Sequence, residues 1–201
     1  QGLLGMVAPQ SYGGLGLTNR EMAVMFQQLA AVDTTVASFV VVNNALGLRP
    51  ILRYATPETR DELMPRLATG RELASFAMTE ADAGSNIRNL SSFGRPDGEG
   101  GWRLWGTKWW SGTASWAGVI NTFVHLEGPG GAPQGVSGFV LRQGAKGLRN
   151  GPEALTMGLR GMVQSQVLLE GVRVTERDRL GALGDGMAPA TNAMEFGRFA
   201  I

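Results

Sequence analysis

The 201-residue sequence contains no cysteine and only one histidine, His125. Without cysteine the chain has no disulfide, no thiolate nucleophile and no thiolate-bound metal. A lone imidazole also argues against a zinc or iron centre, because such centres take several ligands from histidine and cysteine. We therefore expect no metal site. The lack of cysteine fits the cytosol, and we expect a cytoplasmic protein.

An excess of charge of one sign is also lacking, because 18 Lys and Arg residues balance 17 Asp and Glu residues to a net charge of +1. Such a chain has no strong field to attract nucleic acid or an anionic membrane. The most apolar stretch, 36–48, is too short and too polar to span a bilayer. The N-terminus shows no basic segment followed by an apolar run, so we predict no signal peptide. We expect neither a nucleic-acid nor a membrane partner.

The first third of the chain has helical patterning. A Thr-x-x-Glu capping box at residues 18–21 precedes apolar residues at helical spacing. A second helix is predicted over 35–54, with a break or kink at Pro50. A third helix is predicted to begin at the Thr-Pro pair 56–57, which supplies an N-cap and a first-turn proline, and to end near Gly70.

From residue 74 onward the pattern changes to strands and turns. Short apolar or alternating runs, rich in Val, Phe, Trp and Leu, occupy 73–79, 102–108, 120–126, 137–143 and 165–174. Glycine-rich turn clusters separate them, which favours an antiparallel barrel or sandwich. From about residue 186 the pattern is helical again.

This order of textures predicts an α+β protein with several domains. We expect an all-α N-terminal helical domain at 1–73 and an antiparallel β-barrel middle domain at 74–184. Residues 185–201 are expected to start a C-terminal helical domain. Both ends interrupt a pattern, so we expect the chain to be truncated within that last domain.

Hydroxyl and small side chains follow the first predicted strand. The strand ends at Thr79, and the loop continues to Gly84 and Ser85. Two hydroxyls and free backbone N–H groups suit hydrogen bonds to a planar heterocycle and a phosphate. The alternative is a plain hydrophilic loop, which spacing alone favours.

All five tryptophans fall within 102–116. The pair Trp109-Trp110 leads into small residues at 111–113, an arrangement that suits stacking on a large flat ligand. The alternative is that the rings fill a core or an interface, and we expect this for most of the five. Lys108 lies among them. It has the charge to neutralise a phosphate, but we interpret it as a solvated or salt-bridged surface lysine.

Two common nucleotide-binding motifs are missing. Gly184 and Gly186 are followed by Met-Ala-Pro, so the GxGxxG fingerprint fails, and no βαβ unit surrounds it. A GxxxxGK[ST] loop is absent as well. A dinucleotide, if one binds, needs another kind of fold.

Several motifs in the same order resemble acyl-CoA dehydrogenases over nearly the whole chain. The similar segments are 9–16 (P-x-x-Y-G-G-x-G), 74–86 (A-x-T-E-P-x-A-G-S-D), 106–110 (G-x-K-x-W), 157–161 (M-G-x-R-G) and 168–183 (F-x-x-V-x-V-P…L-G). Several motifs in order are far more specific than one. The departures include Ala81, Asn86 and Thr175 at positions where the family has proline, aspartate and proline.

The resemblance implies FAD as cofactor and assigns contacts to it. They are Phe76, Ala77, Met78 and Thr79 at the isoalloxazine, Gly84 and Ser85 at the pyrophosphate, and Trp110, Ser111 and Gly112 along the ring. Ser85 would also touch the acyl-CoA substrate. Gly112 stands where the family often has a flavin-bonding threonine, so we expect Ser111, Thr113 or a backbone N–H to replace it.

The implied reaction is α,β-desaturation of an acyl-CoA thioester, as in fatty-acid β-oxidation. A glutamate removes the α-proton, a hydride passes from the β-carbon to flavin N5, and an electron-transfer flavoprotein takes the electrons. In one branch the base directly precedes an arginine similar to Arg198, but that position is Gly197 here. Glu195 has the wrong offset on a helix. We therefore expect no catalytic base in this chain, and a homodimer or homotetramer for the whole protein.

Two other functions stay open at this point. One is a related flavin monooxygenase or oxidase on the same scaffold. The other is a non-catalytic acyl-CoA-binding module. The resemblance also brings Asn43, Asn44 and Leu46 towards the acyl tail.

Overall fold

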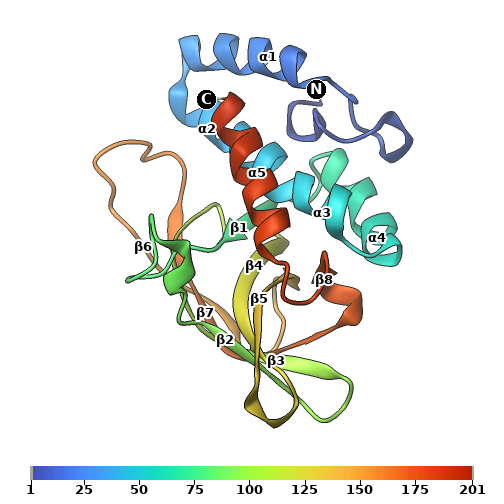
Figure 1. The fold of residues 1–201 in the computed structure, drawn as a ribbon. Coiled ribbons are helices and arrows are strands. Elements are labelled where there is room, and N and C mark those ends of the chain that lie inside the picture. The colour runs from blue at the N-terminus through green and yellow to red at the C-terminus, as the bar shows by residue number, and fades with distance from the viewer. Residues whose placement is uncertain (1, 201) are drawn as a thin grey trace.

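The computed structural model describes residues 2–200 (Figure 1). Helices gather at one end of the molecule and strands at the other. The last helix, α5, runs from the sheet back into the helical end. The predicted order of an N-terminal helical part, a middle β part and a returning helix is confirmed.

The helices begin where local signals place them. They are α1 (Asn19–Val32), α2 (Thr34–Val41), the π-helix η3 (Val42–Leu48), α3 (Arg49–Tyr54), α4 (Pro57–Ala68) and α5 (Met187–Ala200). Short 3₁₀ turns are η1 (Leu3–Gly5), η2 (Gln10–Tyr12), η4 (Ile87–Asn89), η5 (Pro129–Gly131) and η6 (Glu176–Asp178). The capping box of Thr18 and Glu21 forms as predicted. Thr56 caps α4, and Pro57 is its first residue.

The second predicted helix is continuous from Thr34 to Tyr54, so Pro50 does not break it. The helix instead widens to the π-form just before the proline. By length and composition this helix passes for a membrane span, as core helices of folded proteins also do, and 56% of its most apolar window is buried inside the fold. The prediction that this apolar stretch is too short for a membrane span was therefore wrong. The helix is better described as partly buried in the core.

The β part is one eight-stranded sheet. Its strands are β1 (Ala74–Ala77), β2 (Phe93–Pro96), β3 (Gly101–Gly112), β4 (Val119–Glu127), β5 (Pro133–Arg142), β6 (Leu148–Glu153), β7 (Gln164–Thr175) and β8 (Arg179–Leu180). The order is β6-β7-β3-β2-β4-β5-β8, with β1 also paired to β4. The predicted β-sheet middle domain is confirmed, and it differs from an antiparallel barrel in two details. The sheet is open, and β1 and β2 pair with β4 in parallel.

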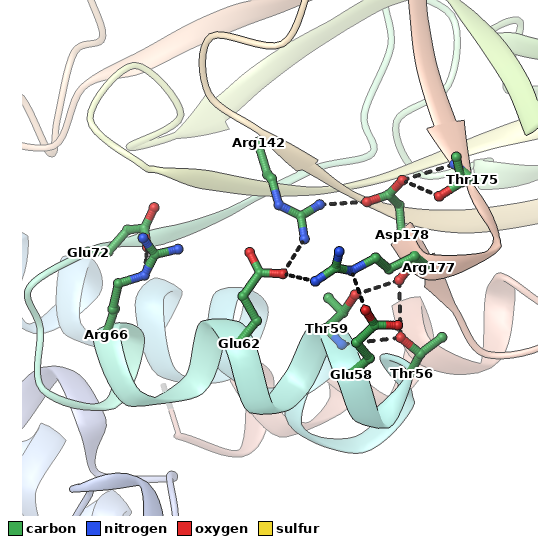
Figure 2. A network of polar contacts seen from close by, with 10 residues as sticks. All are labelled: Thr56, Glu58, Thr59, Glu62, Arg66, Glu72, Arg142, Thr175, Arg177 and Asp178. Carbon is green, nitrogen blue, oxygen red and sulfur yellow. Dashed lines mark hydrogen bonds and ion pairs between the residues drawn. The ribbon is translucent and has the colours of Figure 1, made fainter.

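A charged network joins the helical part to the sheet (Figure 2). The carboxylate of Glu62 on α4 accepts hydrogen bonds from Arg142 at 3.1 Å and from Arg177 at 2.6 Å. Arg142 also reaches Asp178 at 2.5 Å. The hydroxyl of Thr59, fully buried on α4, donates to the carbonyl of Arg177 at 2.6 Å. Glu62 is therefore shared by two arginines that come from β5 and η6.

We expect Glu62→Gln to lower the free energy of unfolding by about 1 kcal/mol at low salt, since two half-exposed ion pairs are lost. The loss should shrink in roughly 0.5 M NaCl because salt screens such pairs. Urea unfolding at both salt concentrations measures it. Glu58→Gln is the control, because Glu58 makes one contact at 3.4 Å and is 68% exposed. Equal losses for the two variants would contradict the assigned role of Glu62.

Candidate active site

The loop after β1 is tied to the end of β3. The N–H of Trp109 donates to the carbonyl of Thr79 at 2.8 Å. Nearer the start of β1, the hydroxyl of Ser75 donates to the carbonyl of Gly112 at 2.7 Å. The structure therefore brings the two predicted flavin-contact segments together, one from each strand.

Trp110 lies in a strained backbone conformation at this junction. Its φ is +56°, in the left-handed region that bulky residues rarely adopt. The residue belongs to a bulge of β3, because the register with β7 shifts between Lys108 and Ser111. Its side chain is 55% exposed, and its ring centroid is 6.2 Å from that of Trp109. Strain of about 1–3 kcal/mol that exposes an indole is typical of a binding site.

Two buried hydroxyls lie beside this bulge. Ser111 and Ser165 are paired across β3 and β7, are 1% and 2% exposed, and have no hydrogen-bond partner for their Oγ atoms among the described residues. A cavity of about 210 Å³ is lined by Trp109, Trp110, Pro152, Glu153, Ala154, Ser165 and Gln166. Unsatisfied buried hydroxyls are costly, so this region has hydrogen-bonding capacity left for a ligand or water.

Position 112 is glycine where the family often has a flavin-bonding threonine, and the structure limits which neighbour can supply that hydrogen bond. The hydroxyl of Thr113 donates to the carbonyl of Gly112 at 2.6 Å, so its proton is committed. Ser111 keeps a free hydroxyl among the residues that the structure describes. Gly112 itself lies beside Met162 and Val42, with room for ordinary contacts. The Ser111 oxygen is buried, however, so of the three predicted replacements a backbone N–H is the one that can reach a ligand.

The loop side chains differ in what they can reach. Ala77 is fully buried and Met78 is 4% exposed, both within core clusters, so either can touch a ligand only through backbone atoms. Phe76 packs its ring 5.1 Å from that of Phe123. Gly84 and Ser85 are exposed. A Cβ built on Gly84 would meet nothing within 4 Å, which leaves open space above the loop.

Lys108 and Glu80 form a buried ion pair beneath the loop. Lys108 is completely buried, and its Nζ lies 2.6 Å from Glu80 Oε1. The same ammonium donates to the carbonyl of Phe123 at 2.5 Å. The interpretation of Lys108 as a surface lysine was therefore wrong, although its salt bridge is real. Lys108 is buried on β3 as Leu104 is, four residues earlier, but no local pattern in the sequence indicates this burial.

Glu80 is held by more than the lysine. It accepts hydrogen bonds from the N–H and hydroxyl of Ser91, at 2.6 and 2.7 Å, and from both donors of Ser92. Burial alone would raise the pKa of Glu80. The charge of Lys108 and the hydrogen bonds from Lys108, Ser92 and Ser91 outweigh burial and lower this pKa to about 2. Sequence reasoning missed this pair, which joins the two motifs of the site.

Two residues predicted near the acyl tail are buried amides that bond to the backbone. Asn43 is buried, accepts from the N–H of Ala74 and donates to the carbonyl of Leu4. Asn44 is equally buried and bonded to the backbone of η1 and its neighbours. Both amides are engaged in holding the fold together, and their position beside an acyl tail stays a prediction. Leu46, in contrast, faces Gly197 on α5.

Two family descriptions match this chain. "Acyl-CoA dehydrogenase, N-terminal domain" covers residues 1–71, and "Acyl-CoA dehydrogenase, middle domain" covers residues 75–172. The very long-chain specific acyl-CoA dehydrogenase of mouse mitochondria is 29% identical over 100% of this chain and 31% of its own length. The L-prolyl-(peptidyl-carrier protein) dehydrogenase of Pseudomonas fluorescens is 33% identical over 98% of this chain and 52% of its own length.

A solved structure agrees with these matches. The acyl-CoA dehydrogenase of Bacillus anthracis, crystallised with FAD, superposes with a TM-score of 0.91 at 27% identity. The match covers 99% of this chain and 33% of that one. This chain thus spans about a third to a half of the length of these relatives. With both domain descriptions matched in sequence order and the same fold in the solved structure, the chain belongs to the acyl-CoA dehydrogenase family.

Proposed function

We propose that this chain is the FAD-binding part of a dehydrogenase that desaturates acyl thioesters. The observation that carries the proposal is Trp110, an exposed indole in a strained bulge beside the loop that Trp109 ties to Thr79. The open space above Gly84, beside the exposed Ser85, fits the phosphate tail of such a flat ring. Bound FAD would supply the acceptor for the hydride.

The residues of this chain have distinct tasks in that proposal. Trp110 stacks beside the flavin ring, and Ser111 and Gly112 follow the ring with their backbone, since the Ser111 hydroxyl is buried. Thr79 contacts the ring from the loop, while Gly84 and Ser85 face the pyrophosphate and the substrate. The ion pair of Lys108 and Glu80 fixes the loop without touching the ligand. The base that removes the α-proton is not among these residues, and an electron-transfer flavoprotein is the proposed electron acceptor.

A second substrate class is a prolyl thioester on a carrier protein. The observation in its favour is the Pseudomonas relative, whose 33% identity exceeds the 29% of the mouse enzyme. Both substrates are thioesters, so the proposed flavin site serves either one. They differ in what carries the thiol, coenzyme A or a protein.

The test uses the natural polypeptide at its full encoded length. The purified protein should carry FAD, and anaerobic mixing with a saturated acyl-CoA should bleach its yellow flavin absorption band. A prolyl-loaded carrier protein is tried in parallel, and bleaching by it alone would select the second class. A rapid production of peroxide in air would instead favour an oxidase. Protein without flavin, after refolding with excess FAD, would overturn the proposal.

We expect Trp110→Ala to weaken FAD binding about tenfold, because an aromatic stacking contact is lost. Titration of apoprotein with FAD, followed by flavin fluorescence, measures the dissociation constant. Trp116→Ala is the matched control: Trp116 is 50% exposed and contacts only the ring of Phe39, at 6.4 Å, among the aromatic pairs described. Equal affinities for the Trp110 variant and the unmodified protein would show that this indole is not a flavin contact.

A further inference from the structure

The continuous helix from Thr34 to Tyr54 contains a proline, which interrupts its backbone hydrogen bonding. Pro50 has no N–H, so it cannot donate to the carbonyl of Leu46, four residues earlier. Just before it the helix is widened, and the N–H of Arg49 donates to the carbonyl of Asn44, five residues earlier. Pro50 and Gly47 are both buried, so water is not a ready donor for the carbonyls that precede the proline.

Asn121 on β4 supplies the missing donor. Its side-chain Nδ2 donates to the carbonyl of Leu46 at 2.9 Å and to that of Gly47 at 2.8 Å. The side chain is completely buried. Only the NH₂ end of an amide can face two carbonyls, so the orientation of this amide is fixed by chemistry. Its Oδ1 has no partner among the described residues, and its contribution is therefore entirely that of a donor.

This repair stands between two parts of the proposed site. Asn121 pairs in register with Phe76 on β1, the strand that leads into the flavin loop. A Cβ on Gly47 would lie 2.4 Å from the carbonyl oxygen of Ala74, so helix and strand are in direct backbone contact. On its other side, η3 presents Leu46 to Gly197 of α5. The π-helix η3 thus packs directly between β1 and α5.

We propose that Asn121 is a positioning residue for the desaturation reaction, because it holds η3 in the π-form against β1. The widened turn sets where Leu46 and Val42 lie relative to Gly112 and the flavin loop. This inference rests on the proposed function, since it concerns how the acyl thioester is placed beside the ring. Asn121 touches neither ligand in this proposal and acts only through the backbone of η3.

Hydrogen–deuterium exchange tests the structural half without any activity. In Asn121→Leu, amides of residues 42–54 should exchange roughly tenfold faster, because two buried carbonyls lose their donor. Adding Pro50→Ala restores a backbone N–H at position 50, so the double variant should regain most of the protection. Thr59→Val is the control, because it also removes a side-chain donor from a backbone carbonyl, that of Arg177, which lies away from η3. Unchanged exchange in Asn121→Leu would overturn the inference.

Anaerobic flavin reduction in the full-length, FAD-loaded protein tests the positioning half. For Asn121→Leu we expect the limiting reduction rate to fall about tenfold, since a small misplacement of substrate is costly. The FAD dissociation constant should change less than about twofold, which separates this variant from Trp110→Ala. Thr59→Val should keep the rate of the unmodified protein. An unmodified protein that no thioester reduces would sink the proposed function; an active one whose rate Asn121→Leu leaves unchanged would sink this inference alone.

Discussion

Replacing Lys108 by methionine lowers the free energy of unfolding by about 3–5 kcal/mol, the usual effect of leaving one member of a buried ion pair without its partner. Lys108 is fully buried and contacts Glu80 at 2.6 Å. Methionine fills a similar volume, so the loss measures charge and hydrogen bonding rather than a cavity. Urea unfolding followed by tryptophan fluorescence gives the value.

The double variant Lys108→Met, Glu80→Gln makes this prediction specific. Without a buried unpaired carboxylate, the double variant should be more stable than Lys108→Met alone, because coupled residues are not additive. The amide oxygen that Glu80→Gln introduces can still accept hydrogen bonds from Ser91 and Ser92. A single variant that loses under about 1 kcal/mol would mean that the pair contributes no more than a surface salt bridge.

The second prediction is that acid removes the stability that ionised Glu80 contributes to the same ion pair. The pKa of Glu80 is lowered to about 2 in the folded protein, against 4.5 for the free group. A lowered folded-state pKa gives stability that is complete above the unfolded pKa and is lost as pH falls through the folded one. We therefore expect about 3 kcal/mol of stability to disappear between about pH 5 and pH 2 on account of this carboxylate. Urea midpoints measured at closely spaced steps of pH give the slope.

Glu80→Gln is the control for that slope. Glu21 and Asp97 also have lowered pKa values, from hydrogen bonds led by the backbone N–H groups of Thr18 and Glu99. They contribute to acid sensitivity in both proteins. The difference between the two pH profiles therefore isolates Glu80. Parallel profiles over this range would show that Glu80 titrates normally.

Features fixed by neighbouring residues were predictable from the sequence. The caps at Thr18 and Thr56 use donors and acceptors within three residues, so their chemistry is visible in the sequence. The strand β2 was not predicted, because it has only four residues and contains a glycine and a proline, which are rare in strands. A Cβ on Gly94 would meet Leu104 at 2.6 Å, so this glycine is there for close packing within a sheet.

Features that depend on distant partners were missed or misread. Pro50 predicts a break, but the helix continues, with a π-helical stretch before the proline and a donor from Asn121, on a strand much later in the chain. Lys108 has the appearance of a surface residue until Glu80 is placed beneath β3. The ring of Trp110 indicates a flavin contact, but no sequence rule predicts its left-handed backbone conformation. Local propensity cannot report such long-range compensation.

The parallel pairing of β1 and β2 with β4 has a consequence for how the protein comes to exist. Ala74 meets Val119, and Phe93 meets His125 on the same edge of that strand. The strands β1 and β2 therefore cannot pair with β4 until the ribosome has made it. Long-range pairing of this kind is slow. The stretch between them, with Glu80 and Ser85, lacks the β4 edge until then, although β3 already offers Trp109 and Lys108 as partners. A nascent chain that stalls before residue 119 would present β1 and β2 with unpaired edges, open to proteases and chaperones alike.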